Sequence, residues 1–491
     1  MISFEEFASS AVEGSAVPLV ETLSADLLTP LSVYLKLSSG GARSFLLESV
    51  EGGENLARFS FIGCDPYMLV SGGANGVEIQ RISDAETLDT PLWSFLRSHF
   101  EDIDVAAAAD LPSFVGGAIG YFGFSCAGWF EPTIRMEDTG SPEAEFMFFS
   151  SIVAFDHVKQ TIKLISLVFV NETDEVSLRR DYETAAASIA SSRRILEEGP
   201  LNIPFASPPQ ATAAVFSNWE RSDFEAAVAG IKESIAAGEC YQVVLSQRFT
   251  KATPANAISV YRALRSLNPS PYMFLLQFPD KAIIGASPEM LVRSRGRNLE
   301  YRPIAGTRPR GRTPEDDETL ARGMAADEKE IAEHQMLVDL GRNDLGRVAK
   351  YGSVKVDGLM RVEKYSHVQH LVSYLSAELR DGCDRFDAFA ACFPAGTVSG
   401  APKVRAIEMI HRLEPTDPGV YAGAVGYFDY SGNMDMCITI RTLVLADGEA
   451  LIQAGAGIVA DSVPAREFDE TENKAKALFR AVEIAESQET K

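Results

Sequence analysis

The sequence predicts a mixed fold of the α/β or α+β class, and two patterns support this prediction. Short β-like runs broken by glycine occur through residues 1–200, and helical and strand-like segments alternate over the rest of the chain without a regular β–α–β rhythm. The 491 residues, 46% of them hydrophobic, can bury a large core. This length corresponds to about two to four domains. Periodicity alone does not choose between the two classes.

The first part of the chain should be rich in strands and should end in a helix. Strand-like runs occur at Ser44–Ser49, Tyr67–Ser71 and Phe146–Phe155. The segment Asp174–Glu198 is polar and alanine-rich, with apolar residues at helical spacing. It predicts a helix that ends near Gly199.

A proline-rich segment follows that helix. Residues 200–215 contain four prolines and little charge, which is typical of a linker. We therefore expect an N-terminal region over residues 1–205 and a second region over residues 216–491. The second region should open with a helix from Asn218 to Ala237, followed by a strand over Tyr241–Thr250.

The composition excludes several classes of function. The net charge of −24 argues against binding to nucleic acid or anionic membranes, because both need a basic face. The N-terminus MISFEEFASS lacks the features of a signal peptide, and the apolar stretches are too short to span a bilayer. The six cysteines are scattered and form no C-x-x-C pair, so we expect reduced thiols and a cytoplasmic protein.

Two pairs of carboxylates could hold a metal ion. Glu330 and Glu333 are three residues apart in a segment with helical periodicity, and Glu467 and Glu470 repeat this spacing after Pro464. Each pair alone is more typical of a solvated helix face or of the first turn of a helix. Together, however, four carboxylates from two helices suit a hard divalent cation such as Mg²⁺.

Three glycine-rich turns are joined to apolar strands, at residues 303–307, 393–403 and 453–458. Glycine lets a ligand approach the backbone, and free N–H groups in such turns can bind anions. None of the three has the spacing of a P-loop or of a dinucleotide-binding fingerprint, so we do not expect nucleotide binding.

Together these segments resemble the chorismate-utilising enzymes, and within them the large subunits (component I) of anthranilate synthases. The resemblance covers essentially the whole chain and is densest from Gly238 to Arg480. It implies two stacked antiparallel β-sheets flanked by helices, with an interleaved N-terminal regulatory region. The motifs that carry it are GECYQVVLSQRF, NPSPYMF, GASPEM, PIAGTRPRGR, DEKEIAEHQMLVDLGRND, SHVQHLVS, GTVSGAPKVRAIEMI, YAGAVGYF, CITIRT, QAGAGIVADSVP and ETENKA.

The resemblance implies a reaction on chorismate, a small dicarboxylate. Ammonia attacks ring carbon 2, the hydroxyl on carbon 4 leaves, and loss of pyruvate then gives anthranilate, the first step of tryptophan biosynthesis. By position, Glu289 matches the general acid and His370 matches the histidine linked to pyruvate elimination. The residues that match the Mg²⁺ ligands, directly or through water, are Glu333, Glu470, Glu330 and Glu467.

Further positions match contacts to the substrate. Arg441 and Tyr421 match residues that grip the enolpyruvyl carboxylate, which a planar guanidinium can bind bidentately. Lys474 lies one helical turn beyond Glu470 and would offset local negative charge. The backbone and hydroxyl contacts match Gly306, Thr307, Thr397, Gly455, Ala456 and Gly457.

Two positions indicate the branch of the family. Isochorismate and salicylate synthases use water as the nucleophile and carry a lysine where this chain has Gln242, which cannot act as a base. Enzymes of the para-aminobenzoate branch often carry a lysine that attacks the ring, where this chain has Ala305. Both absences favour direct addition of ammonia at carbon 2. Aminodeoxychorismate synthase component I is the alternative, because some para-aminobenzoate enzymes also lack that lysine.

The N-terminal region carries a predicted feedback site. The segment Leu46–Ser49 (LLES) matches the tryptophan-binding motif of the family, and Asn268–Met273 supplies the opposite wall. A carboxylate could pair with the amino group of tryptophan, and aromatic and thioether side chains offer apolar contact to an indole. The predicted inhibitor-binding residues are Glu48, Ser49, Pro271, Tyr272, Met273, Val425 and Tyr427.

The chain shows no nucleophile-elbow cysteine with a matching histidine, so we do not expect it to release ammonia from glutamine by itself. The resemblance implies a partner glutamine amidotransferase subunit (component II), in a heterodimer or heterotetramer. A sensor that binds tryptophan or chorismate without turnover is the competing class of function. The presence of Glu289, His370 and both carboxylate pairs argues against it.

Overall fold

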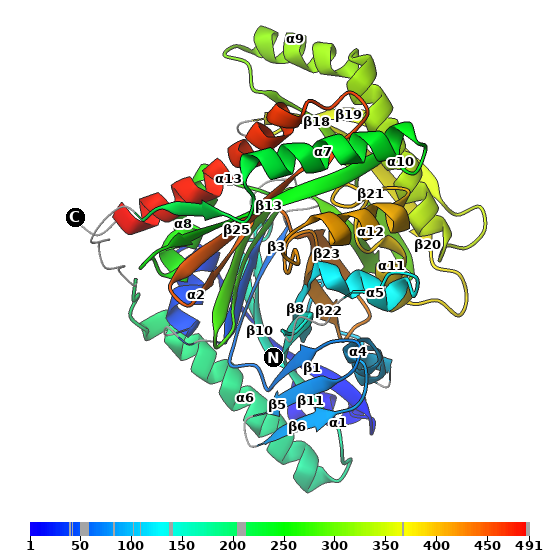
Figure 1. Ribbon diagram of the computed structural model, residues 1–491. Coiled ribbons are helices and arrows are strands. Elements are labelled where there is room, and N and C mark those ends of the chain that lie inside the picture. The colour runs from blue at the N-terminus through cyan, green and yellow to red at the C-terminus, as the bar shows by residue number, and fades with distance from the viewer. Residues whose placement is uncertain are drawn as a thin grey trace.

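The computed structural model describes the chain except residues 39–40, 42, 50–57, 82–83, 102, 109, 137–140, 204–212, 366–367 and 488–491 and the side chains of Thr307 and Lys329. The described residues form two large sheets with helices around them (Figure 1). Nearly all strand pairs are antiparallel, and the pair β1–β7 is parallel. This architecture confirms the predicted fold of two stacked antiparallel sheets.

The first sheet contains 13 strands in the described residues. In order across the sheet they are β12 (Val215–Ser217), β13 (Gln242–Ala252), β25 (Glu449–Ile458), β24 (Thr442–Ala446), β15 (Lys281–Ser287), β14 (Tyr272–Gln277), β2 (Ser44–Glu48), β3 (Phe59–Cys64), β10 (Ser151–Asp156), β11 (Thr161–Phe169), β1 (Ser15–Ser24) and β7 (Asp104–Val105), with β21 (Gly400–Ala401) beside β13.

The second sheet contains 12 strands in the same described ranges. In order they are β18 (Ile304–Pro309), β20 (Val368–Glu378), β17 (Asn298–Tyr301), β16 (Met290–Arg295), β23 (Met434–Ile438), β22 (Ala424–Asp429), β8 (Gly117–Phe122), β9 (Ala144–Phe149), β4 (Met68–Gly72), β5 (Val77–Arg81) and β6 (Ala85–Leu88), with β19 (Lys355–Lys364) beside β20.

Helices pack around these sheets. Helix α6 packs on β11 and helix α13 on β25, both in the first sheet, whereas α10 packs on β18 and β20 of the second. The helices are α1 (Phe4–Ser10), α2 (Pro30–Ser38), α4 (Leu92–Glu101), α5 (Ala127–Phe130), α6 (Glu175–Glu198), α7 (Arg221–Ala236), α8 (Ala257–Leu267), α9 (Pro314–Ala325), α10 (Glu328–Gly346), α11 (Arg385–Cys392), α12 (Lys403–Leu413) and α13 (Pro464–Ser487), with a 3₁₀ turn η1 (Phe124–Cys126).

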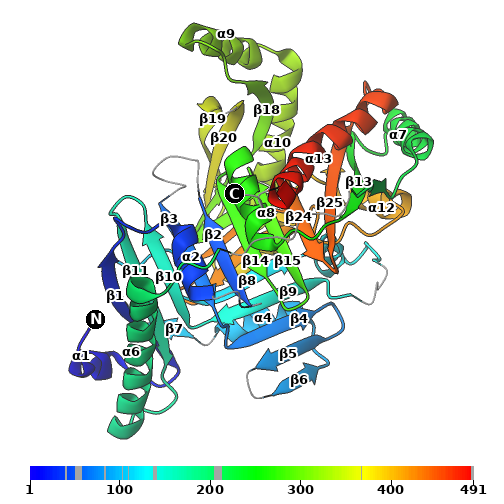
Figure 2. The ribbon, with the colours of Figure 1, turned by 90° about the vertical axis from the view of Figure 1, so that its left-hand side faces the viewer.

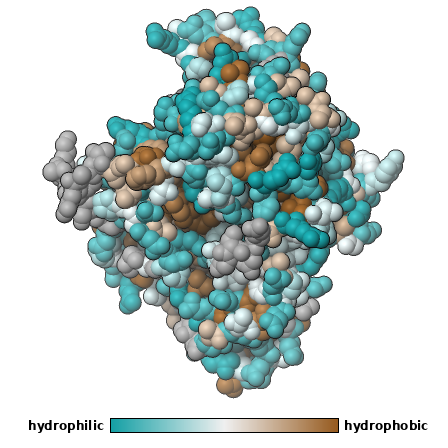
Figure 3. Space-filling model, in the orientation of Figure 1, coloured by the Kyte–Doolittle hydropathy of each residue, from teal (hydrophilic) through white to brown (hydrophobic). Residues whose placement is uncertain are grey.

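The core has two layers because successive strand residues face opposite sides of a sheet. On β2, Phe45 faces the second sheet, and its ring lies 4.8 Å from that of Phe149 on β9. The next residue, Leu46, belongs to the other core cluster, which includes residues of α8 and α13. One layer therefore joins the two sheets, and the other joins the first sheet to its helices. Hydrophilic residues cover most of the face seen in Figure 3, in keeping with the net charge of −24.

The two stretches of chain that flank the predicted linker share both sheets. Strand β14 pairs with β2 in the first sheet, and β22 pairs with β8 in the second. The predicted boundary between residues 205 and 216 falls largely in residues 204–212, outside the described part of the chain. Each sheet contains strands from both stretches. The division into regions 1–205 and 216–491 therefore stays a prediction from the sequence.

An arm rises from one end of the two sheets. It consists of β18, α9, α10, β19 and β20, and both views show α9 at its tip, away from the remaining helices (Figures 1 and 2). Strands β19 and β20 pair along most of their length, and β18 pairs with β20 on its other edge. The arm brings the motifs PIAGT, DEKEIAEH and VQHLV to one place.

Most predicted elements are found in the structure. The helix expected to end near Gly199 is α6, the helix expected from Asn218 is α7, and α13 starts at Pro464. The run Phe146–Phe155 is not a single strand, because the chain crosses at Ser150 from β9 in the second sheet to β10 in the first. Both strands are almost wholly buried, so the run lacks the polar alternation that would have marked the crossing.

Two further expectations concern disulfide bonds and membrane-spanning helices. All six cysteines are unpaired, as the scattered spacing predicted. No helix in the described ranges has the length and apolar character needed to cross a membrane.

Candidate active site

A cavity of about 240 Å³ lies between the arm and the body of the protein; we call it the first cavity. Strands β13 and β25 of the first sheet line one side, and β18 and β20 of the second sheet line the other. Helices α10 and α13 contribute Glu333 and Lys474 to its wall. Both predicted carboxylate helices therefore border the same cavity, although about 140 residues separate them in the sequence.

Glu289 lies in the first cavity, between the end of β15 and the start of β16. Its residue is 7% exposed. Burial raises its pKa to about 8, although the neighbouring Thr397 hydroxyl lowers the pKa in part. The backbone holds this position firmly, since the Ile438 N–H donates to the Glu289 carbonyl at 3.0 Å. At neutral pH, Glu289 is therefore a protonated acid that can donate a proton.

His370, on β20, lines the same cavity on the side of the arm. Its Nδ1 lies 3.0 Å from the carbonyl oxygen of Gly306. A carbonyl can only accept, so Nδ1 carries the hydrogen and Nε2 keeps its lone pair. Burial lowers the pKa of His370, and the nearby cation Arg441 lowers it further. The imidazole is therefore neutral and can act as a base.

Arg441 and Tyr421 supply a cation and a hydroxyl to the same cavity. Arg441 adopts a φ of +51°, a conformation that side chains other than glycine rarely accept. Burial lowers the pKa of this guanidinium and raises that of Tyr421. The backbone strain at Arg441 indicates that the surrounding fold imposes its position.

Small residues give the cavity its room. A side chain at Gly455 would place its Cβ 2.6 Å from the Tyr421 hydroxyl, and one at Gly457 would approach Gln242 to 2.9 Å. Gly306 has a φ of +63°, in the left-handed region that favours glycine. Ala456, between the two strand glycines, is fully buried and belongs to the core cluster, so its side chain faces away from the cavity.

The predicted metal ligands lie on the two helices that border the cavity, but they are engaged in different ways. Glu330 pairs with Arg308 at 2.8 Å and Glu470 pairs with Lys474 at 2.7 Å, whereas Glu333 lines the cavity itself. Among the described residues, no three His, Cys, Asp or Glu side chains are already grouped around a common point. The donors have the chemistry that Mg²⁺ prefers, and the metal role stays a proposal.

The structure thus brings most of the predicted site together. The predicted residues that line the first cavity are Glu289, His370, Gly306, Thr397, Tyr421, Arg441, Gly455, Gly457, Glu333 and Lys474. Glu330, Glu467, Glu470 and Ala456 are not part of its lining, and the side chain of Thr307 lies outside the description. Sequence reasoning missed Gln453, which also lines the cavity and opens the motif QAGAGI.

A second cavity, of about 100 Å³, lies between the two sheets at β2, β14 and β22. Strands β2 and β14 are neighbours with Glu48 opposite Met273, so the motifs LLES and NPSPYM form adjacent parts of one wall. The prediction that the second motif supplies the opposite wall is therefore wrong, because the two strands pair in one sheet. The Ser49 hydroxyl donates to the Pro271 carbonyl at 2.7 Å. The predicted residues that line this cavity are Glu48, Ser49, Pro271, Tyr272, Met273, Val425 and Tyr427.

Buried charges in the second cavity are paired. Arg293 Nε donates to Asp435 at 2.7 Å, and both side chains are at most 10% exposed. The Glu48 carboxylate is paired with Arg265 at 3.0 Å and accepts from the Tyr261 hydroxyl. The negative charge of Glu48 is therefore already balanced by Arg265 on α8, which the LLES motif did not predict.

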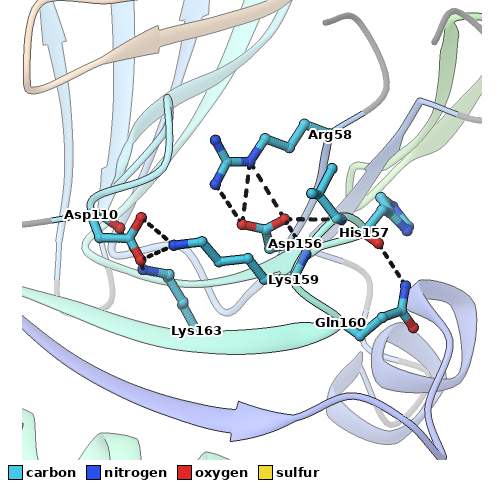
Figure 4. A network of polar contacts seen from close by, with 8 residues as sticks. Arg58, Asp110, Asp156, His157, Lys159, Gln160 and Lys163 are labelled. Carbon is cyan, nitrogen blue, oxygen red and sulfur yellow. Dashed lines mark hydrogen bonds and ion pairs between the residues drawn. The ribbon is translucent and has the colours of Figure 1, made fainter. Parts of the chain in front are cut away.

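A polar network holds Arg58 at the edge of the second cavity (Figure 4). Arg58 Nη2 donates at 2.9 Å to Asp156, whose side chain is fully buried. Asp156 also accepts the backbone N–H groups of Val158 and Lys159 in the β10–β11 turn. Lys159 pairs in turn with Asp110 at 2.7 Å. No local pattern predicts the place of Arg58, because its ion-pair partner Asp156 is about 100 residues away in the sequence.

Comparisons with known proteins indicate the family of the chain. Residues 46–480 match the model of the chorismate binding enzymes. Anthranilate synthase component 1 of Acetivibrio thermocellus is 44% identical over 98% of both chains. The crystal structure of anthranilate synthase component I from Streptococcus pneumoniae TIGR4 is 36% identical with a TM-score of 0.75, over 93% of this chain and 99% of that chain. The Escherichia coli isochorismate synthase MenF shares the fold, with a TM-score of 0.71 over 97% of both chains at 20% identity.

The chain therefore belongs to the family of chorismate-binding enzymes. Within this family it groups with component 1 of anthranilate synthases, because proteins of that name are 42–44% identical to it over nearly its whole length.

Proposed function

We propose that the chain converts chorismate and ammonia to anthranilate and pyruvate. The observation that carries this proposal is the first cavity, where a buried acid, a neutral imidazole and a guanidinium meet: Glu289, His370 and Arg441. This set supplies one proton donor, one proton acceptor and one anion-binding group. The same three functions are needed for loss of a hydroxyl, loss of a proton and capture of a carboxylate.

The two titratable groups divide the proton transfers between them. Glu289, with a pKa raised to about 8 by burial, donates its proton to the hydroxyl that leaves ring carbon 4. His370 Nε2 then takes the proton from ring carbon 2 as the bond between carbon 3 and the enolpyruvyl oxygen breaks and pyruvate leaves. The Gly306 carbonyl holds the imidazole in the tautomer that this step requires.

Local cations bind the anionic substrate in spite of the net charge of −24. Arg441 and Tyr421 would hold the enolpyruvyl carboxylate. Mg²⁺, held by Glu333 and Glu470 with Glu330 and Glu467 directly or through water, would neutralise the ring carboxylate. Because Glu330 and Glu470 are paired with Arg308 and Lys474, those ion pairs would have to open for the cation.

We propose a feedback role for the second cavity, with tryptophan as the ligand. The seven predicted residues line this cavity together, and the aromatic rings of Phe59 and Phe61 add to its apolar wall. We also propose that ammonia comes from a glutamine amidotransferase subunit, since the relatives are named component 1 and the chain shows no glutaminase motif.

One assay tests these proposals. The purified chain is incubated with chorismate, Mg²⁺ and an ammonium salt, with and without tryptophan, and the product is followed by fluorescence and identified by mass. We expect anthranilate, inhibition by tryptophan, loss of activity with EDTA and its recovery with Mg²⁺. Aminodeoxychorismate as the product would establish the para-aminobenzoate alternative instead. Turnover with glutamine by the chain alone would refute the need for a partner.

A further inference from the structure

A row of polar residues continues the floor of the first cavity along β13 and β25. Ser246 lies opposite Gly455 and Arg248 lies opposite Gln453 in this antiparallel pair. Opposite residues share a face, and both Gly455 and Gln453 line the cavity. Ser246 and Arg248 therefore lie on the same face of the sheet as these cavity residues, just beyond the cavity itself.

Hydrogen bonds connect this row from the cavity toward the surface. Gln453 Nε2 donates to the Ser246 hydroxyl at 2.7 Å, and Arg248 Nε donates to Gln453 Oε1 at 3.0 Å. The Arg248 backbone N–H donates to Asn218 Oδ1 at 2.8 Å, and Asn218 Nδ2 donates to the Thr416 hydroxyl at 2.8 Å. Asn218 and Thr416 are partly exposed, so the row runs from the cavity to the molecular surface.

A buried carboxylate lies beside this row. Glu414 follows the last residue of α12, and its Oε1 accepts the backbone N–H of Ser246 at 2.6 Å. Its Oε2 is buried and has no hydrogen-bond partner among the described residues. Burial raises the pKa of Glu414 to about 8, Ser246 and Arg248 oppose the rise, and Asp417 adds to it. An unpartnered buried oxygen of this kind is costly and calls for a ligand.

The charges around Glu414 fit a small monovalent cation. When Glu414 is ionised, its charge and that of Asp417 exceed the positive charge of Arg248 by one. Because burial raises the pKa of Glu414 to about 8, a cation competes with the proton for this carboxylate at neutral pH. Tyr421, on the cavity wall, is a further titratable group beside Glu414, and burial together with the charge of Glu414 raises its pKa and keeps it protonated. Glu414 Oε2, the Ser246 hydroxyl and Gln453 Oε1 are oxygen acceptors for a cation that donates hydrogen bonds in several directions.

We propose that this row binds an ammonium ion and that Glu414 takes a proton from it, which releases ammonia next to the first cavity. An N–H bond breaks, an O–H bond forms at Glu414 Oε2, and the nitrogen keeps the electron pair that it uses as a nucleophile. The proton on Glu414 returns to solvent before the next turnover. This inference rests on the proposed function, because the reaction it serves consumes ammonia.

The test is the dependence of the ammonium KM on pH, measured with the whole chain, ammonium chloride, chorismate and Mg²⁺. In the wild type, the KM for total ammonium should fall with rising pH and level off above the pKa of Glu414. At pH 7, Glu414→Gln should raise this KM about tenfold or more, as expected for loss of one hydrogen bond to a charged group. The KM for chorismate should not change.

The pH profile separates a proton acceptor from a structural role. In Glu414→Gln the KM should keep falling by about tenfold per pH unit, because only free ammonia can be used and its fraction rises at that rate. Glu414→Asp keeps a carboxylate, so its KM for total ammonium should again level off at high pH. Glu408→Gln is the matched control, because Glu408 lies on α12, which Glu414 directly follows, and pairs with Arg405 away from the row; it should behave like the wild type.

An ammonium KM and a pH profile in Glu414→Gln equal to those of the wild type would overturn the inference. A rise in the chorismate KM that matches the rise in the ammonium KM would also overturn it, because it would indicate a general distortion of the cavity. Failure of the wild type to form anthranilate from ammonium would instead contradict the proposed function.

Discussion

The first and the second cavity are lined by strands of the same two sheets, but they hold buried charge in different ways. In the second cavity, Arg293 is paired with Asp435 and Glu48 with Arg265. In the first cavity, Glu289 is buried without a cationic partner among the described residues, and its pKa is about 8. Paired charges fix the shape of a binding site, whereas a lone buried acid keeps its proton available at a cost in stability.

One strand connects the two cavities. Glu289 directly precedes β16, and this strand carries Arg293 and Arg295 to the second cavity. At about 3.3 Å per residue, Glu289 and Arg293 are about 13 Å apart along the strand. The neighbouring strand β23 contacts both sites, since the Ile438 N–H donates to Glu289 and Asp435 pairs with Arg293. A shift of this strand pair is the physical route that we expect between effector and active site.

The largest expected effect is on catalysis. Glu289→Gln keeps the shape of the side chain but removes the proton that it donates, so kcat/KM for chorismate should fall about 10²–10⁴-fold. Anthranilate fluorescence measures the rate, and calorimetry should show tryptophan binding unchanged. A rate near that of the wild type would refute the acid role, and lost tryptophan binding would show that the two cavities are not separable.

The contrast in charge pairing predicts opposite effects on stability. Asp435→Leu leaves Arg293 buried without its carboxylate and should lower the free energy of unfolding by about 3–5 kcal/mol. Glu289→Leu removes a lone buried acid and should be neutral or stabilising. Urea unfolding of both variants measures the difference. Equal destabilisation by the two substitutions would remove the distinction between the cavities.

Ser49→Phe should affect regulation alone. The larger ring would fill the second cavity beside the Pro271 carbonyl, so the tryptophan concentration for half inhibition should rise about 50-fold or more, with uninhibited activity near that of the wild type. Ser49→Ala loses only one hydrogen bond and should give a rise of about fivefold. Unchanged inhibition in Ser49→Phe would rule out this cavity as the feedback site.

The smallest expected effect is on the pH dependence of stability. Glu289 has an ordinary pKa of 4.5, whereas its folded pKa is about 8, so between these values folding takes up a proton. Its contribution is fully present below pH 4.5 and is lost as pH rises through 8. The Tm of Glu289→Gln relative to the wild type should therefore increase by about 2–4 °C from pH 5 to pH 8 in calorimetry. A constant difference would show that Glu289 is ionised in the folded protein.

Some of the site could be predicted without coordinates. The spacing of Glu330 and Glu333 correctly predicted that both lie on one helix, and the motifs LLES and NPSPYM identified residues that line the second cavity. Their placement on opposite walls was wrong, because β2 and β14 are neighbouring strands of one sheet. Arg58, Arg293 and Arg295 were not predicted there, because their partners come from distant strands. Ala456 was predicted, together with Gly455 and Gly457, as a contact to substrate, and its side chain is buried away from the cavity because side chains alternate along a strand. Its backbone role as a substrate contact stays a prediction.

The sequence by itself determined the local elements and the chemical groups, because helix periodicity, caps and motif residues depend on neighbours within a few positions. Tertiary structure decided which groups meet: it placed α10 and α13 at one cavity, set β2 beside β14, and sent β9 and β10 into different sheets. Those choices follow from burial of apolar faces between residues hundreds of positions apart, which no local pattern records. Burial in the same core also turned Glu289 from an ordinary carboxylate into an acid that is protonated at neutral pH.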